Sequence, residues 1–524
     1  MSPPSRLVVG VPLYPDWTES ESSQKHASSG DKQPTQWHHN VIEEPRRFVS
    51  LGFQDVAWAF VFVAHVTGIT MVAAYNVRAF VSGELFSKRP DLFPSTAAPV
   101  TVEAHHGSSP PSLIELGAGL VIAALVTSLL LTAVRFFAAS FIRASITFSV
   151  VMCAVMCVSA IAAGSILMAA LFALCTVGSI MWYFAVLPRV PFSSYLLSLS
   201  SALVARYYGV LVATVVMIKL VALYVAAWIV AIAAAVVYYA PVMPRSQGRN
   251  LAVPRHAADH SEQSIGTAAL FLAFLFCLFW TVQVASNVIH VTACGLAATY
   301  YFAGPVHMPR NPSWASFKRS ITTSFGSICF GSAVVAFLQV LRFIAHELRR
   351  ADNNFIRCIA ECLIACVEAL VERINVYAFS YMAIYGTSYI ESGRRAMDLL
   401  FTAPEGFEAI INDCLVLPAI RFAILTGTLL AFLLAFLVLG APMAAMVAGL
   451  TAACLSVYLS SVYAATVTVF LCFADCPSAA EGSNPQLHDD LTTLVRRGYM
   501  AFPAAYVPSP SLLSPHLHTY GTVV

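Results

Sequence analysis

The chain has 524 residues, of which 58% are hydrophobic and only 11% are charged, whereas a soluble domain averages roughly 25% charged residues. The formal net charge is +2, which excludes the strongly basic surface typical of nucleic-acid binding. The composition predicts a polytopic membrane protein built from helices, with no nucleic-acid partner.

The amino-terminal part predicts a tail followed by a first membrane span. Residues 1–48 are rich in Ser, Pro, Gln and His, which predicts a disordered tail. The first apolar run, 54–77, follows about fifty polar residues, so we expect it to act as the insertion signal in place of a cleavable signal peptide. The proline-rich segment 78–112 carries no N-x-S/T acceptor and is predicted to be a short extracellular loop.

Uncharged runs that are too long for one helix indicate where hairpins form. Residues 144–188 would make a helix of about 68 Å, about twice the thickness of a bilayer core. We therefore expect two spans that turn near Gly164 and Ser165. By the same reasoning, the uncharged residues 422–474 form two spans that are divided at Gly440.

Together these runs predict an all-α polytopic membrane protein with about ten transmembrane helices in one bundle and disordered N- and C-terminal tails. Besides those named above, the expected spans are 113–134, 207–239, one long tilted or broken span within 264–309, 320–345, and 353–385. A short interfacial helix is expected over 189–206.

The span count and the charge distribution predict the orientation of the chain. An even number of spans leaves both ends on one side. Arg and Lys are modestly more frequent on the side of the N-terminus, which favours the cytosol. The expected domains are a cytosolic tail (1–48), a ten-span membrane domain (49–474) and a cytosolic C-terminal tail (475–524).

The cysteines and acids give no sign of a metal or a cofactor. Eight of the 13 cysteines lie inside apolar runs, where cysteine behaves as a small buried hydrophobic residue. No CxxC pair frames a metal site, and no Cys-rich outer loop indicates a disulfide framework. We therefore expect neither a metal site nor a cofactor.

The span at 353–385 is unusual because it carries acids in its middle. On a helix, Glu361, Glu368 and Glu372 fall within about 40° of one another, and Asn375 extends the same stripe. Carboxylates inside a membrane are costly and usually mark a function. The stripe predicts the wall of a polar cavity. The alternative is an amphipathic helix that lies on the membrane surface with its acids toward water.

Two neighbouring spans carry further polar or small residues. Gln283, Asn287 and His290 share one face of the predicted span within 264–309, where such residues either line a cavity or form hydrogen bonds between helices. In the next span, Gly326 and Gly331 are expected to allow the close approach of another helix.

Four long stretches resemble the choline transporter-like family, most closely its fungal and protist branch. They are FWTVQVASNVIHVTACGLAATYYF (279–302), RSITTSFGSICFGSAVVAFLQVLR (319–342), LVERINVYAFSYMAIYGTSYIESGRRAMDLL (370–400) and GFEAIINDCLVLPAIR (406–421). The segment CFADCPSAAEGSNPQLHDDL (472–491) is similar to the family's C-terminal segment. The loop 78–112 departs from the large glycosylated loop of the animal members.

The resemblance implies a ten-span transporter with both ends in the cytosol, often at the plasma membrane, that passes choline or a related amine. It also implies that 353–385 crosses the membrane. A quaternary ammonium is recognised by aromatic faces and a nearby negative charge. The candidate substrate-binding residues are Glu368, Trp280, Gln283, Asn287, His290, Tyr300, Tyr301, Glu361, Glu372 and Asn375.

Glu368 is the first choice of acid because it lies in the middle of its span and matches the family's Glu ahead of an Asn-x-x-Ala-Tyr-like motif. The only basic residues of that span, Arg357 and Arg373, lie three turns away or point about 140° away from it. Glu368 is therefore expected to lack a local partner, which a substrate cation or a proton could replace. The alternative is a hydrogen bond to a Ser, Asn or His of the sixth span.

Trp280 is the first choice of aromatic residue because it precedes the polar face of Gln283 by close to one helical turn. Two other classes of function stay open at this point. A membrane-embedded enzyme of lipid headgroups would need a catalytic motif, and no DxxD…DxxxD or HExxH pattern is found in the chain, so we expect no enzyme. A non-transporting scaffold or sensor is the remaining alternative.

Overall fold

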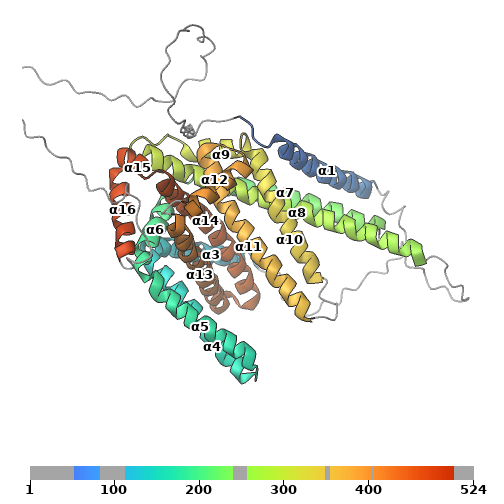
Figure 1. The fold of residues 1–524 in the computed structure, drawn as a ribbon. Helices are drawn as coiled ribbons and strands as arrows, with labels where there is room; N and C mark the ends of the chain where they lie inside the picture. The colour runs from blue at the N-terminus through green and yellow to red at the C-terminus, as the bar shows by residue number, and fades with distance from the viewer. Residues whose placement is uncertain (1–51, 83–111, 240–256, 348–353, 403–405, 501–524) are drawn as a thin grey trace, which may run out of the picture. The chain divides into compact units, whose positions relative to one another are not determined.

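A computed structural model describes residues 52–82, 112–239, 257–347, 354–402 and 406–500. The predicted tail 1–48, most of the loop 78–112 and the last 24 residues lie outside this described part. Ten helices are long (Figure 1): α1 (Val56–Val81), α3 (Leu113–Phe136), α4 (Ala138–Ala162), α5 (Ile166–Val186), α7 (Gly209–Tyr239), α8 (Ala257–Ala303), α10 (Phe325–Glu347), α11 (Asn354–Tyr385), α13 (Gly406–Leu439) and α14 (Ala441–Asp475).

The remaining helices of the described part are short. They are η1 (Leu187–Arg189), α6 (Val190–Arg206), α9 (Pro312–Ile321), α12 (Tyr389–Thr402), α15 (Pro477–Ser483) and α16 (Pro485–Met500). The protein is an all-α polytopic membrane protein, as the sequence predicts.

Nine helical segments of the described part are long and apolar enough to cross a membrane. The long helix that does not meet this condition is α11, because acids and arginines interrupt its apolar sequence. It is nevertheless 32 residues long and packs against α8, α10 and α14. These helix–helix contacts place α11 within the bundle.

Glycines form both predicted hairpin turns. Gly164 connects α4 to α5 with a φ of 72°, and Gly440 connects α13 to α14 with a φ of 84°. Backbone in this left-handed region favours glycine because any Cβ would be crowded. α4 packs against α5, and α13 packs against α14, so the chain reverses where the sequence predicts.

Two helices differ in extent from the predicted spans. α8 is one continuous helix of 47 residues, so the long run at 264–309 is not broken. α13 begins at Gly406 and continues through Pro418, whereas the predicted ninth span begins at residue 422. As a result, the charged residues Asp413 and Arg421 belong to the same helix as the apolar run that follows them.

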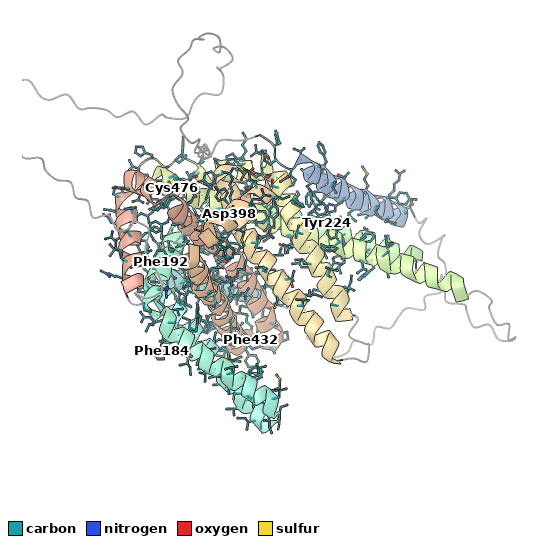
Figure 2. All side chains as sticks on the ribbon, viewed as in Figure 1. Phe184, Phe192, Tyr224, Asp398, Phe432 and Cys476 are labelled. Atoms are coloured by element: carbon teal, nitrogen blue, oxygen red, sulfur yellow. The ribbon has the colours of Figure 1, made fainter. Side chains whose placement is uncertain are left out.

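The core of the bundle is centred on α14. In its most apolar 18-residue window, 83% of the residues are buried. α14 packs against α3, α6, α8, α11 and α13. Large aliphatic side chains on other helices face outward, as lipid-facing residues do. Figure 2 labels one example of each environment: Phe192 on α6 is 5% exposed, whereas Phe184 on α5 is 64% exposed.

The C-terminal segment is more ordered than the sequence indicates. Asp475 is followed by α15 and α16, and Leu487, Leu491 and Val495 of α16 are buried in the main hydrophobic core. The hydroxyl of Tyr195 on α6 donates a hydrogen bond of 2.9 Å to Asp490. The predicted interfacial helix 189–206 is the helix α6, and it lies partly buried under α16.

Candidate functional site

Glu368 forms an ion pair with Arg342 of the neighbouring helix α10. The Arg342 Nη1 atom lies 2.9 Å from the Glu368 Oε2 atom. The two side chains differ in environment, since that of Glu368 is 9% exposed and that of Arg342 is 64% exposed. The sequence predicts no partner for Glu368 within its own span, and the partner found comes from another helix. The alternative partner, a polar residue of the sixth span, is not the one found either.

Glu372 lies one turn along α11 from Glu368 and is exposed. Arg342 of α10 and Arg421 of α13 are both close enough to Glu372 to act on it electrostatically. Glu361 lies on the helix α11, but its side chain is outside the described residues. The acidic stripe of α11 thus faces arginines from two neighbouring helices.

Asp413 is the deepest acid of the described bundle and was not selected from the sequence. It is 1% exposed. Its two carboxylate oxygens accept hydrogen bonds from Arg373 of α11 and from the hydroxyl of Tyr463 on α14. In the sequence, Asp413 lies outside the uncharged run 422–474. Only the continuation of α13 back to Gly406 places it inside the bundle.

Trp280 lies away from these acids, in an aromatic cluster with α1. Its ring is stacked on His65 at a centroid distance of 4.8 Å and makes an edge contact with Phe62. The indole N–H donates to the backbone oxygen of Cys329 at 2.9 Å. The side chain is 3% exposed, and its described contacts account for its burial by packing.

The polar face of α8 divides into residues with and without partners. The Asn287 side-chain amide donates to the Ser332 hydroxyl at 2.9 Å, which is the interhelical hydrogen bond considered above. The His290 Nε2 atom is buried and has no hydrogen-bond partner in the described part of the chain, and its ring lies 6.3 Å from that of Phe379 on α11. Gln283 is partly exposed.

Asn375 and Tyr301 make contacts near the ends of helices. The Asn375 side-chain oxygen accepts a hydrogen bond from the hydroxyl of Tyr389, and burial raises the pKa of Tyr389 to about 12, so this donor keeps its proton at neutral pH. The Tyr301 hydroxyl donates to the backbone oxygen of Cys476 at 3.0 Å. Tyr300, beside it, is partly buried against the same core.

Both glycines of α10 lie against other parts of the chain. A methyl group at Gly326 would overlap the backbone oxygens of Gln54 and Asp55, just before α1. A methyl group at Gly331 would meet the rings of Tyr389 and Phe379. The side chain of Asp55 also accepts hydrogen bonds from the Ser327 hydroxyl (2.5 Å) and the Tyr389 backbone N–H (3.1 Å).

The candidate site is therefore a set of paired charges on α10, α11 and α13, and it does not include Trp280. The described residues contain no group of His, Cys, Asp and Glu side chains that could hold a metal ion. A bundle of long apolar helices defines a multi-pass membrane protein, and charged residues between such helices are rare.

Comparison with known proteins identifies which kind of membrane protein this is. The family described as plasma-membrane choline transporter matches residues 170–478, which is more than half of the chain. The chain belongs to this family, the choline transporter-like family. The family is described as one of transporters.

Similar individual proteins come from a slime mould and from fungi. A CTL-like protein of Dictyostelium discoideum is 29% identical over 336 residues, which cover 62% of this chain and 56% of that protein. Protein PNS1 of Debaryomyces hansenii is 31% identical over 45% of each chain. Protein PNS1 of Cryptococcus neoformans is 26% identical over 80% of this chain and 73% of its own length. The chain spans about half the length of the first two.

Proposed function

We propose that this protein transports choline or a related organic cation or amine across the plasma membrane, by a facilitative or proton-linked mechanism. The observation that carries the proposal is the match of residues 170–478 to the plasma-membrane choline transporter family. That range includes every residue of the paired-charge set on α10, α11 and α13, so the candidate site lies in the part of the chain that the family shares.

The acids of α11 support a cationic substrate. A carboxylate inside a membrane costs about 2.5–3.5 kcal/mol on insertion scales, so its presence calls for compensation by a partner or a function. Glu368 is only 7% exposed, and it lies next to Glu372 on the same helix. We propose that Glu368 is the anionic partner of the substrate cation and that Glu372 and Asn375 lie along the same route.

His290 is the residue that favours a proton-linked version of the mechanism. Its Nε2 atom is buried without a described partner, and histidine changes its charge near physiological pH. A transported proton or a substrate group could complete its hydrogen bonding. Gln283 and Asn287 share the face of α8 from which His290 projects, and we retain them as candidates for substrate contact.

Uptake of labelled choline into liposomes that contain only this protein tests the proposal. We expect saturable uptake that Glu368→Gln lowers strongly, because glutamine keeps the shape of the side chain and removes its charge. Glu391→Gln is the matched control, since Glu391 pairs with Arg395 on the short helix α12. Absence of uptake of choline and other organic amines by wild-type protein would favour a scaffold or sensor instead.

The proposed topology has ten spans with the N- and C-termini in the cytosol and the loop 78–112 outside. It rests on the modest excess of Arg and Lys on the side of the N-terminus. Single cysteines at positions 30 and 500 should resist a membrane-impermeant thiol reagent in intact cells. Labelling of either position from outside would show that the topology is wrong.

A further inference from the structure

The ion pair between Arg342 and Glu368 joins an exposed side chain to a buried one. Glu368 is held in the packed helix α11 and is 9% exposed at its side chain, whereas Arg342 is 64% exposed. Arg342 also lies five residues before the end of α10 at Glu347. A long arginine side chain near a helix end can extend toward the membrane surface, so the guanidinium can leave Glu368 without crossing the core.

The charges of this region balance without any substrate. The described side chains around the ion pairs of α10, α11 and α13 include three acids and three arginines. The acids are Glu368, Glu372 and Asp413, and the arginines are Arg342, Arg373 and Arg421. A neutral set offers no net attraction to a permanent cation. A cation that binds here must therefore take the place of an arginine.

The two arginines that form ion pairs, Arg342 and Arg373, differ in how readily a substrate cation can replace them. Arg373 is paired with Asp413, which is 1% exposed and also bonded to Tyr463, so its removal would leave a deeply buried acid unpaired. Arg342 is the more exposed of the two paired arginines, at 64% against 38%. Exposed ion pairs are weak because water and side-chain entropy oppose them. Of these two paired arginines, Arg342 is the one that a substrate can displace more easily.

We propose that Arg342 is a tethered counter-cation that occupies Glu368 between transport events and that the substrate cation displaces. The proposal rests on the transport function proposed above. It makes Arg342 a determinant of affinity for cations, through competition for the same carboxylate and without contact between Arg342 and the substrate.

Glu372 gives the displaced arginine a second position. Glu372 lies one helical turn from Glu368, and Arg342 is close enough to interact with it electrostatically. The guanidinium can move from Glu368 to Glu372 while the substrate is bound and return when the substrate leaves. Both carboxylates then stay compensated in each state, which avoids the cost of an unpaired charge in the membrane.

Kinetics of choline uptake into liposomes test the competition, because removing Arg342 and removing Glu372 should change the KM for choline in opposite directions. Arg342→Gln removes the competitor and should lower the KM for choline by roughly two- to fivefold, the scale of an exposed ion pair. Glu372→Gln removes the second position of the arginine and should raise the KM. Lys219→Gln, which removes an exposed cation from α7, should leave the KM unchanged.

An unchanged or higher KM in Arg342→Gln, measured on protein that elutes as a single species, would overturn the proposal. A higher KM would mean that Arg342 contacts the substrate, as expected for a zwitterion. Should Arg342→Gln fail to fold, Arg342→Lys decides, because an ammonium lacks the two-pronged pairing of a guanidinium and competes less well for the carboxylate: a lower KM supports the proposal and an unchanged KM overturns it. Failure of the transport function is distinct, since wild-type protein would then take up no choline.

Discussion

Helices α5 and α14 are both almost free of charged residues, yet their environments are opposite. Apart from Asp475 at the end of α14, neither helix contains a charged residue. Within α5, whose side chains are all described, Val186 alone is buried, whereas most of α14 is buried, including an unbroken run from Ser461 to Ala474. Apolar composition therefore identifies a membrane span without indicating whether it faces lipid or protein.

The difference lies in the size and polarity of the side chains. α14 is rich in Ala, Ser and Thr, and its buried hydroxyls bond within the helix or to neighbours, as Thr468 does with the Ser380 hydroxyl on α11 at 3.1 Å. α5 instead presents large exposed side chains such as Leu167 and Met181. Small residues let helices approach closely, and in lipid this packing replaces the hydrophobic effect as the basis of association.

The largest loss of stability should come from breaking the ion pair between Asp413 and Arg373, to which Tyr463 of α14 adds a hydrogen bond. Asp413→Ala leaves Arg373 without its partner; breaking a buried pair typically costs about 3–5 kcal/mol, and the partial exposure of Arg373 reduces this cost. We expect the variant to lose most of its folded population, as measured by size-exclusion chromatography after extraction and by the thermal midpoint. The helix α5 itself carries no charged residue.

Tyr463→Phe is the milder control for that variant. It removes only the hydroxyl that donates to Asp413, so the loss should be about 1 kcal/mol. If Asp413→Ala is as stable as Tyr463→Phe, the Arg373 pair contributes little and the polar contact does not distinguish the core from the periphery.

The next largest difference in stability should appear when an alanine of each helix is replaced by a larger residue. Ala464 of α14 is fully buried, and Ala464→Leu should destabilise the fold by about 1–3 kcal/mol because the packed core has no room for the added atoms. Ala170 of α5 is exposed, so Ala170→Leu should be tolerated. Thermal midpoints in detergent measure both variants. Equal midpoints would mean that the core around α14 is loosely packed.

A single added methyl group gives a smaller and more local comparison. Gly326→Ala would push a methyl group into the backbone oxygens of Gln54 and Asp55, whereas nothing lies within 4 Å of a methyl group at Gly178 of α5. We expect Gly326→Ala to lower the thermal midpoint by the equivalent of about 1–2 kcal/mol. Gly178→Ala should be neutral or stabilising, since alanine is the better helix former.

The smallest effect is expected where α16 meets α6. Tyr195→Phe removes the hydrogen bond to Asp490, which should cost about 0.5–1.5 kcal/mol. Because the buried leucines of α16 are unchanged, limited proteolysis should still find the C-terminal helix protected. Rapid cleavage within 485–500 in this variant would show that the hydroxyl, and not the apolar face of α16, holds the helix in place.

The sequence determined where most of the long helices lie, because the relevant signals are local. The length of an uncharged run sets how many spans it can form, and Gly164 and Gly440 mark the turns. The acids of α11 were also visible, since residues seven and four apart share a face of a helix. Local pattern could not supply the partner of Glu368, because Arg342 belongs to another helix.

The tertiary structure decided which residues meet and which face lipid. Asp413 enters the interior only because α13 continues through Pro418, and Trp280 packs against His65 of α1, more than 200 positions away in the chain. The physical reason is that lipid and protein interior are equally apolar, so hydrophobicity alone does not distinguish the inside of the bundle from the outside. Side-chain size, hydrogen bonds and ion pairs between distant helices decide it.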